Sequence, residues 1–159
     1  MLHLRLADIM SKPVVTARPT ETIRAVAKRM NLHGIGCVVV VDQRRVVGVV
    51  TERDLLRLTA KGVSPDAAKA REAMSRPPIT ATLFDEIPEA IRLLVFNNIK
   101  KLPVLDDGRL VGIVTFSDFA QLAPAYGDFF ASAMGEANRR VRERFEKHLH
   151  GPPDPWSFV

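Results

Sequence analysis

The sequence predicts an α/β protein in which two β-α-β-β-α repeats pack with pseudo-twofold symmetry and are followed by an amphipathic C-terminal helix. Residues 10–56 align with residues 74–120 without a gap at a constant offset of 64, and 15 of the 47 aligned positions are identical. Strand-like and helical hydrophobic patterns alternate in the same order in both copies. Because a unit of about 50–60 residues buries too little of its own sheet, we expect the two copies to share a core.

Each copy begins with a short extended segment and a helix. Residues 13–16 and their copy, residues 77–80, start with Pro, which is typical of an edge strand. Apolar residues then follow at the i, i+3, i+4, i+7 spacing that predicts one buried helix face. These residues are Ile23, Val26, Ala27 and Met30 in the first copy, and Ile87, Ala90, Ile91 and Leu94 in the second. Pro88 falls in the first turn of the second helix, where a missing N–H costs little.

A strand hairpin and a second helix complete each copy. The apolar, β-branched run at residues 37–41 predicts a strand that is buried on both faces, and residues 102–105 are its copy. Turn-forming residues follow each strand and lead to returning strands at residues 46–50 and 110–114. Second helices are expected to begin near Thr51 and Thr115. The predicted repeats span residues 6–60 and 70–122, with a linker at residues 61–65 between them.

The end of the chain lies outside the repeat. Residues 128–150 carry apolar residues at helical spacing and predict an amphipathic helix, and the Pro-rich residues 151–159 predict an extended tail. Residues 135–150 hold five Lys or Arg against three Glu. Nucleic-acid binding is therefore one alternative function, although the remaining charge is scattered along the chain.

Composition limits the class of protein. The chain has 159 residues, 47% of them hydrophobic, and a net charge of +5. The single cysteine, Cys37, excludes an internal disulfide framework and is typical of a reducing compartment. Residues 1–5 contain no apolar leader, and no apolar run approaches the roughly 20 residues that a membrane span needs. We therefore expect a cytoplasmic protein.

A Gly-x-x-Thr-x-x-Asp pattern recurs at the end of both copies, as Gly48, Thr51 and Asp54 and again as Gly112, Thr115 and Asp118. One interpretation is structural, because Thr followed three residues later by Asp forms a helix capping box. The other is a binding site. A glycine inside a strand marks the close approach of another backbone or a ligand, and a free helix N-terminus binds anions. With a hydroxyl and a carboxylate nearby, such a site suits a ribose that carries phosphate.

These motifs resemble a known family. The β-α-β-β-α repeat, the Asp-Ile-Met-Ser-x-Pro opening at residues 8–13 and the repeated Gly-x-x-Thr-x-x-Asp resemble a tandem pair of cystathionine β-synthase (CBS) domains, a Bateman module. The resemblance covers residues 6–122. It implies a regulatory, non-catalytic module that binds AMP, ADP or ATP, or in some members S-adenosylmethionine or NAD, in two clefts between the repeats. It also implies a homodimer that forms through the helices.

The resemblance also assigns roles to particular residues. Asp54 and Asp118 would hold the ribose hydroxyls, with Thr51 and Thr115 beside them. The adenine-lining segments would be Val14, Val15 and Thr16 in the first copy, and Pro78, Ile79 and Thr80 in the second. Lys100 and Lys101 would reach the phosphates, and Arg53 and its counterpart Ser117 occupy the remaining phosphate-side positions.

The two copies differ where phosphate would bind. Gly36 and Cys37 stand where the second copy has Lys100 and Lys101, so one cationic arm is missing from the first copy. We expect two unequal clefts, with Arg53 partly compensating for the missing lysines. A solvated loop is the alternative interpretation of Lys100 and Lys101.

Other features indicate no further chemistry. The sequence has no Walker-type glycine loop and no nucleophile elbow, and His148 and His150 supply too few ligands for a metal site. No catalytic residues and no catalytic cofactor are expected. The remaining alternative is a ligand-free interaction module that docks through its C-terminal helix onto a regulated protein such as an enzyme or transporter.

Overall fold

The computed structural model describes residues 4–122, 124, 126–128, 131–132, 135–136 and 139. Its helices are α1 (Leu6–Ile9), α2 (Ile23–His33), α3 (Glu52–Ala60), α4 (Ala70–Ala73), α5 (Ile87–Phe96) and α6 (Phe116–Ala120). Its strands are β1 (Thr16–Ala17), β2 (Cys37–Asp42), β3 (Arg45–Thr51), β4 (Ala81–Thr82), β5 (Lys101–Asp106) and β6 (Arg109–Thr115). Most of the helix expected at residues 128–150, and all of the tail expected at residues 151–159, lie outside the described residues.

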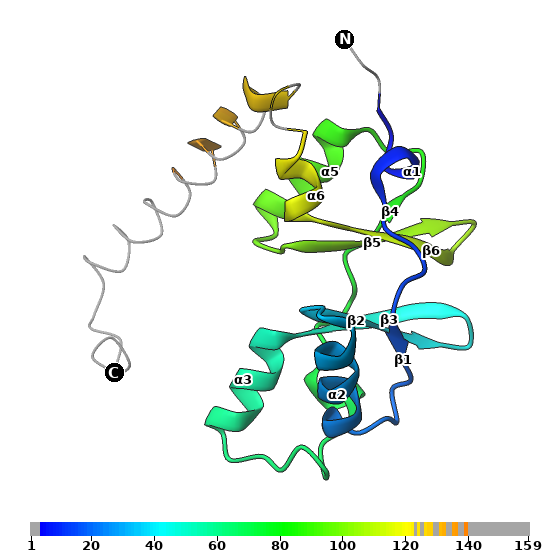
Figure 1. Cartoon of the computed structure of the whole chain (residues 1–159), viewed down its shortest axis with the longest axis vertical. Helices are drawn as coiled ribbons and strands as arrows, with labels where there is room; N and C mark the ends of the chain where they lie inside the picture. The colour runs from blue at the N-terminus through cyan, green and yellow to red at the C-terminus, as the bar shows by residue number, and fades with distance from the viewer. Residues whose placement is uncertain are drawn as a thin grey trace.

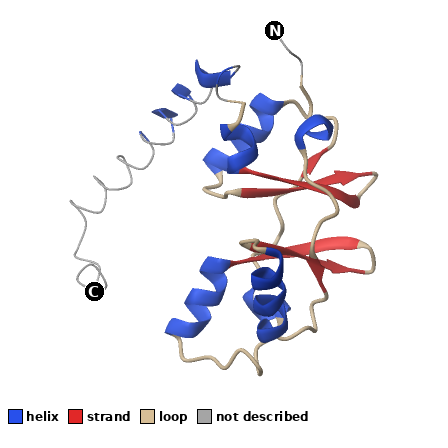
Figure 2. Ribbon diagram, in the orientation of Figure 1, coloured by secondary structure: helices blue, strands red, loops and turns tan. Residues whose placement is uncertain are grey.

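The strands form two matching sheets, with orders β1-β2-β3 and β4-β5-β6. In each sheet the first strand, β1 or β4, runs parallel to the middle strand, β2 or β5. The middle strand forms an antiparallel hairpin with the third strand, β3 or β6. The sheets lie one above the other in the middle of the molecule and the helices cover their outer faces (Figures 1 and 2), and β3 contacts β6. The predicted α/β repeat with pseudo-twofold symmetry is confirmed.

Sequence pattern predicts most of these elements well. The predicted face of α2 buries Ile23, Val26 and Met30, and that of α5 buries all four predicted residues. The edge strands are shorter than expected and begin later, at Thr16 and Ala81. The residues before them, which include Pro13, Pro77 and Pro78, are not in regular strands, and a proline lacks the N–H that a regular ladder needs. The sheet therefore starts only after the Pro-containing segment.

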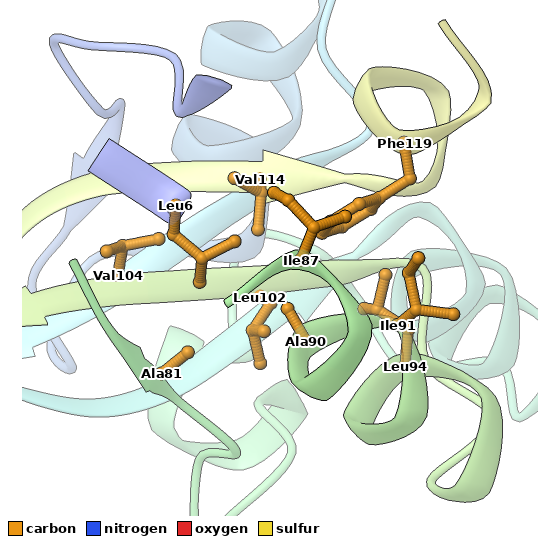
Figure 3. Packing of buried hydrophobic residues seen from close by; sticks show 10 residues of the cluster. All are labelled: Leu6, Ala81, Ile87, Ala90, Ile91, Leu94, Leu102, Val104, Val114 and Phe119. Carbon is orange, nitrogen blue, oxygen red and sulfur yellow. The ribbon is translucent and has the colours of Figure 1, made fainter. Parts of the chain in front are cut away.

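The short helices α1 and α4 were not predicted, and they are exchanged between the repeats. Leu6 of α1 is fully buried in the core of the second repeat (Figure 3), and its N–H donates to the carbonyl of Asp85 at 3.0 Å. Ala70 of α4 is buried in the core of the first repeat, and its N–H donates to the carbonyl of Glu21 at 2.8 Å. Each spatial half thus contains the helix with which the other repeat begins in the chain.

We call the first half β1, α2, β2, β3, α3 and α4, and the second half α1, β4, α5, β5, β6 and α6. Two chain segments therefore pass between the halves, one after α1 and one after α4. Their exchange ties the halves together, because neither core is complete without residues from the far side of the crossing.

The strand glycines are explained by this exchange, and not by a ligand. A Cβ on Gly48 would lie 2.7 Å from Cγ of Met74, and a Cβ on Gly112 would lie 2.7 Å from Cγ of Met10. Each methionine lies near the start of one repeat and packs on the strand glycine of the other repeat. The repeated Met and Gly are therefore partners in packing: each glycine does mark a close approach, and the methionine side chain of the other repeat makes it.

We expect Gly48→Ala and Gly112→Ala each to lower the free energy of unfolding by about 1–3 kcal/mol through overpacking. Urea denaturation measures the change, and Gly127→Ala, where a Cβ would meet no atom within 4 Å, serves as the control. Combining Gly48→Ala with Met74→Ala should cost less than the sum of the two single changes. Additive costs would contradict the packing explanation.

Candidate functional site

A pocket of about 460 Å³ opens between the two halves. Its walls come from three places: the start of α3 in the first half, the segment that crosses after α4, and the loop before β5 in the second half. Its lining residues are Gly36, Val49, Thr51, Glu52, Arg53, Asp54, Arg57, Ser75, Pro77, Pro78, Ile79, Asn98, Ile99, Lys100 and Lys101. The size falls within the range of about 300–1,000 Å³ that is usual for small-molecule sites.

The start of α3 provides a carboxylate at one end of the pocket. Asp54 is only 3% exposed, and its Oδ2 accepts hydrogen bonds from the Thr51 N–H at 2.8 Å and the Thr51 hydroxyl at 2.9 Å. The capping interpretation is therefore confirmed at this position. The same carboxylate also lines the pocket, so capping and ligand binding do not exclude each other.

Two backbone N–H groups at the start of α3 are not free for an anion, although the sequence led us to expect a free helix N-terminus. The N–H of Thr51 is bound by Asp54, and the N–H of Glu52 donates to the carbonyl of Gly36 at 3.2 Å. Both groups are therefore engaged within the protein. Positive potential in the pocket must come mainly from side chains.

Those side chains are numerous. Four cationic residues, Arg53, Arg57, Lys100 and Lys101, line the pocket with two acidic residues, Glu52 and Asp54. The excess of positive charge favours an anionic ligand, because a cleft lined by one sign of charge concentrates the opposite sign.

Gly36 makes room for part of this charge. A Cβ at Gly36 would lie 2.6 Å from Nζ of Lys101 and 2.7 Å from Oε2 of Glu52. The absent side chain thus allows Lys101 to lie across the half boundary against β2. Gly36 lines the pocket, whereas from the sequence we considered it only as the position where the first copy lacks the lysine of the second.

The pocket brings together seven of the predicted site residues: Thr51, Arg53, Asp54, Pro78, Ile79, Lys100 and Lys101. The other seven, Val14, Val15, Thr16, Thr80, Thr115, Ser117 and Asp118, do not line it. Pseudo-symmetry relates most of them to residues of this pocket. Asp118, for example, repeats the cap geometry, with its Oδ2 2.6 Å from the N of Thr115 and 2.9 Å from its hydroxyl.

The role expected of Arg53 is corrected by its position. Arg53 lines the same pocket as Lys100 and Lys101, because α3 of one repeat faces the lysine loop of the other. Its charge therefore adds to that of the lysines and does not compensate for their absence elsewhere. The difference in charge between the residues that line this pocket and their counterparts in the other repeat is therefore larger than the sequence indicated.

Arg57 was also missed. Its guanidinium forms an ion pair with Oδ1 of Asp54, and it lines the pocket. The i, i+3 spacing of Asp54 and Arg57 on a helix was the available signal. At the corresponding position of the second repeat the sequence has the neutral Gln121.

Other candidate chemistry is limited. Cys37 is buried, and burial raises the pKa of its thiol, which disfavours the reactive thiolate. Within the described part of the chain, no group of three or more His, Cys, Asp or Glu residues is placed to hold a metal ion. None of the helices described there is long and apolar enough to cross a membrane. His148 and His150 lie outside the described residues.

The fold and the pocket define a class of protein, a pair of intertwined α/β repeats with a polar cleft between them. The chain belongs to the CBS domain family, whose model matches residues 6–61 and residues 70–124. A relative from Methanopyrus kandleri, uncharacterized protein MK0525, is 36% identical over 146 residues, which are 90% of this chain and 72% of that protein.

Solved structures agree with this assignment. The CBS domain pair of protein MJ0100, in complex with 5′-methylthioadenosine and S-adenosyl-L-methionine, has a TM-score of 0.72 at 31% identity and covers 78% of this chain and 98% of its own. The CBS domain protein PAE2072 from Pyrobaculum aerophilum, complexed with AMP, has a TM-score of 0.69 at 29% identity and covers 76% and 99%.

Proposed function

We propose that this protein is a regulatory, non-catalytic module that binds AMP, ADP or ATP in the pocket between its halves. The observation that carries the proposal is the pocket itself, in which a buried carboxylate and four cationic side chains face one cavity. Solved relatives that hold AMP, or S-adenosylmethionine with 5′-methylthioadenosine, support an adenosine-containing ligand.

Each part of the nucleotide has a candidate partner. Asp54 accepts from the ribose hydroxyls, and Thr51 holds its carboxylate in position. Pro78 and Ile79 offer apolar surface to the adenine. Lys100, Lys101 and Arg53 supply positive charge to the phosphates.

The charge of the pocket favours a phosphorylated ligand over S-adenosylmethionine. The methionine moiety adds a positive sulfonium next to four cationic side chains, whereas phosphate neutralises them. NAD also carries phosphate, and it remains the alternative that a ligand panel must include.

We further propose that the related set around Thr115, Ser117 and Asp118, with Val14, Val15 and Thr16 from the adenine-lining segment of the first repeat, binds phosphate more weakly. In this set the neutral Ser117 and Gln121 replace Arg53 and Arg57. Gly36 and Cys37 replace the two lysines. One cleft of the pair would then dominate nucleotide binding.

Regulation requires that the nucleotide prefers one of two states. We propose that binding between the halves shifts the equilibrium of a cytoplasmic homodimer, or of a complex with a regulated protein. If instead the protein is a ligand-free interaction module, no nucleotide will stabilise it. Nucleic-acid binding through residues 135–150 would show a steep dependence on salt.

Thermal unfolding with adenosine, AMP, ADP, ATP, NAD and S-adenosylmethionine tests the proposal. A ligand at 100 times its Kd stabilises the folded state by about 2.7 kcal/mol, and we expect AMP, ADP or ATP to give the largest shift. If none of these compounds stabilises the protein at millimolar concentration, the proposal is wrong.

Removing the lysines should weaken phosphate binding specifically. We expect the Lys100→Ala, Lys101→Ala double variant to bind ATP about tenfold more weakly, because two partly exposed charge-assisted contacts are lost. Calorimetry at low and high salt measures the change, and salt should affect the variant less than the wild type. Lys28→Ala, which removes an exposed lysine of α2 that does not line the pocket, is the matched control. An equal loss in both variants would contradict a local role for the lysines.

A further inference from the structure

The two oxygens of the Asp54 carboxylate are engaged in different ways. Oδ2 accepts both hydrogen bonds from Thr51, at 2.8 Å and 2.9 Å, and so belongs to the start of α3. Oδ1 accepts from a terminal nitrogen of Arg57. In the free protein, therefore, the oxygen that is not used by the helix cap is occupied by an arginine.

The two partners of this ion pair differ in exposure to solvent. The side chain of Asp54 is 5% exposed, whereas that of Arg57 is 55% exposed. The carboxylate is fixed by its burial and by the Thr51 bonds, but the guanidinium ends a long side chain with access to solvent. Arg57 can leave Asp54 without any change in the backbone.

A ligand hydroxyl that binds Asp54 must compete with Arg57 for Oδ1. Displacing the guanidinium breaks a charge-assisted hydrogen bond. A neutral nucleoside offers the released guanidinium no new partner. A nucleotide offers its phosphate, and Arg57 lines the same pocket as Arg53, Lys100 and Lys101.

We propose that Arg57 is a specificity-determining residue that blocks Asp54 against unphosphorylated nucleosides and joins the phosphate-binding cations when a nucleotide displaces it. This inference rests on the proposed function, because it requires a ribose at Asp54. It assigns to one residue the coupling between the ribose end and the phosphate end of the pocket.

The chain contains two internal comparisons for this role. Gln121 occupies the position of Arg57 in the second repeat, beside an Asp118 with the same cap bonds, so Gln is compatible with this helix position. Arg53 lies on the same helix and lines the same pocket, but the ion pair of Asp54 is made by Arg57. Arg57→Gln thus removes the competing cation, and Arg53→Gln removes a pocket cation of equal charge that does not compete.

Calorimetric titration of the full chain with adenosine, AMP and ATP tests the inference, with thermal unfolding of each variant as a check of folding. For Arg57→Gln we expect adenosine to bind about tenfold more tightly, since the hydrogen bond that it must break is absent. AMP and ATP are spared the same cost but lose the contact of Arg57 with phosphate, so their affinities should change little and the preference for nucleotide over adenosine should fall about tenfold. For Arg53→Gln we expect weaker AMP and ATP binding without any tightening of adenosine. Arg57→Lys should keep most of the ATP affinity, because it keeps the charge.

A tightening of adenosine that AMP and ATP do not share distinguishes this role from a purely structural one, which would move the affinities for all three ligands together. If adenosine binds Arg57→Gln no more tightly than it binds the wild type, or if all three affinities change by the same factor, the inference is overturned and the proposed function stands. A wild-type protein that binds none of the three ligands would overturn both.

Discussion

Replacement of Asp54 by Ala is expected to weaken nucleotide binding at least hundredfold. The carboxylate is buried and lines the pocket, and we propose that it accepts from the ribose hydroxyls; two hydrogen bonds to a charged group amount to about 3 kcal/mol or more. That free energy corresponds to a factor of about one hundred in Kd. Titration calorimetry with ATP and AMP measures the loss.

Asp118→Ala is the matched control, because Asp54 also caps its helix. Both substitutions remove the same pair of bonds to the preceding threonine, so each should lower the free energy of unfolding by about 1–2 kcal/mol. Only Asp54→Ala should remove the dominant nucleotide site, since Asp118 does not line the pocket. Equal losses of ATP affinity in the two variants would show that the cationic pocket has no special role.

Replacement of Leu6 by Ala is expected to cost about 2–5 kcal/mol of stability, as is usual for a fully buried leucine. Leu6 begins the first repeat in the chain but is 0% exposed in the core of the second half, which also contains Ile87 and Phe119 (Figure 3). Urea denaturation measures the change. Leu56→Ala, at a leucine that is 69% exposed, should change stability by less than about 0.5 kcal/mol.

This comparison tests the exchange of α1 and α4 directly. If α1 did not complete the second core, Leu6→Ala would behave like Leu56→Ala. A cost below about 1 kcal/mol for Leu6→Ala would therefore contradict the exchanged arrangement.

Elements with strong periodicity were predictable from the sequence. The faces of α2 and α5 follow the helical spacing of their apolar residues, and β2 follows its run of valines. The hairpin turns were also predictable from the turn-forming residues that follow each strand. In the structure, residues 43–44 and 107–108 adopt the positive φ that tight hairpin turns require. In each case the signal lies within one short segment of the chain.

The exchange of α1 and α4 was not predictable in the same way. A helix of four residues is one turn long and shows no periodicity that could distinguish it from a loop. Each of these helices packs on the other repeat. An alignment of the two copies cannot show whether a helix packs on its own copy or on the other one. The close approach of Met74 to Gly48 and of Met10 to Gly112 follows from the same exchange.

The candidate site was predictable in its residue types but not in its grouping. The sequence predicts Thr51, Asp54, Lys100 and Lys101 as binding residues, and the structure places all four on one pocket. The sequence could not place Arg53 in the same pocket as the lysines, because Arg53 and the lysines belong to different halves. The sequence could not identify Gly36 as a pocket residue either, since the need for a glycine there depends on which side chains approach it in the fold.

A crystal structure of the protein with AMP tests the central claim most directly. We predict that AMP lies in the pocket between the halves, with its ribose hydroxyls on Asp54, its adenine against Pro78 and Ile79, and its phosphate toward Lys100 and Lys101. AMP bound away from this pocket, or bound there with its phosphate beside Asp54 and its ribose at the lysines, would contradict the claim.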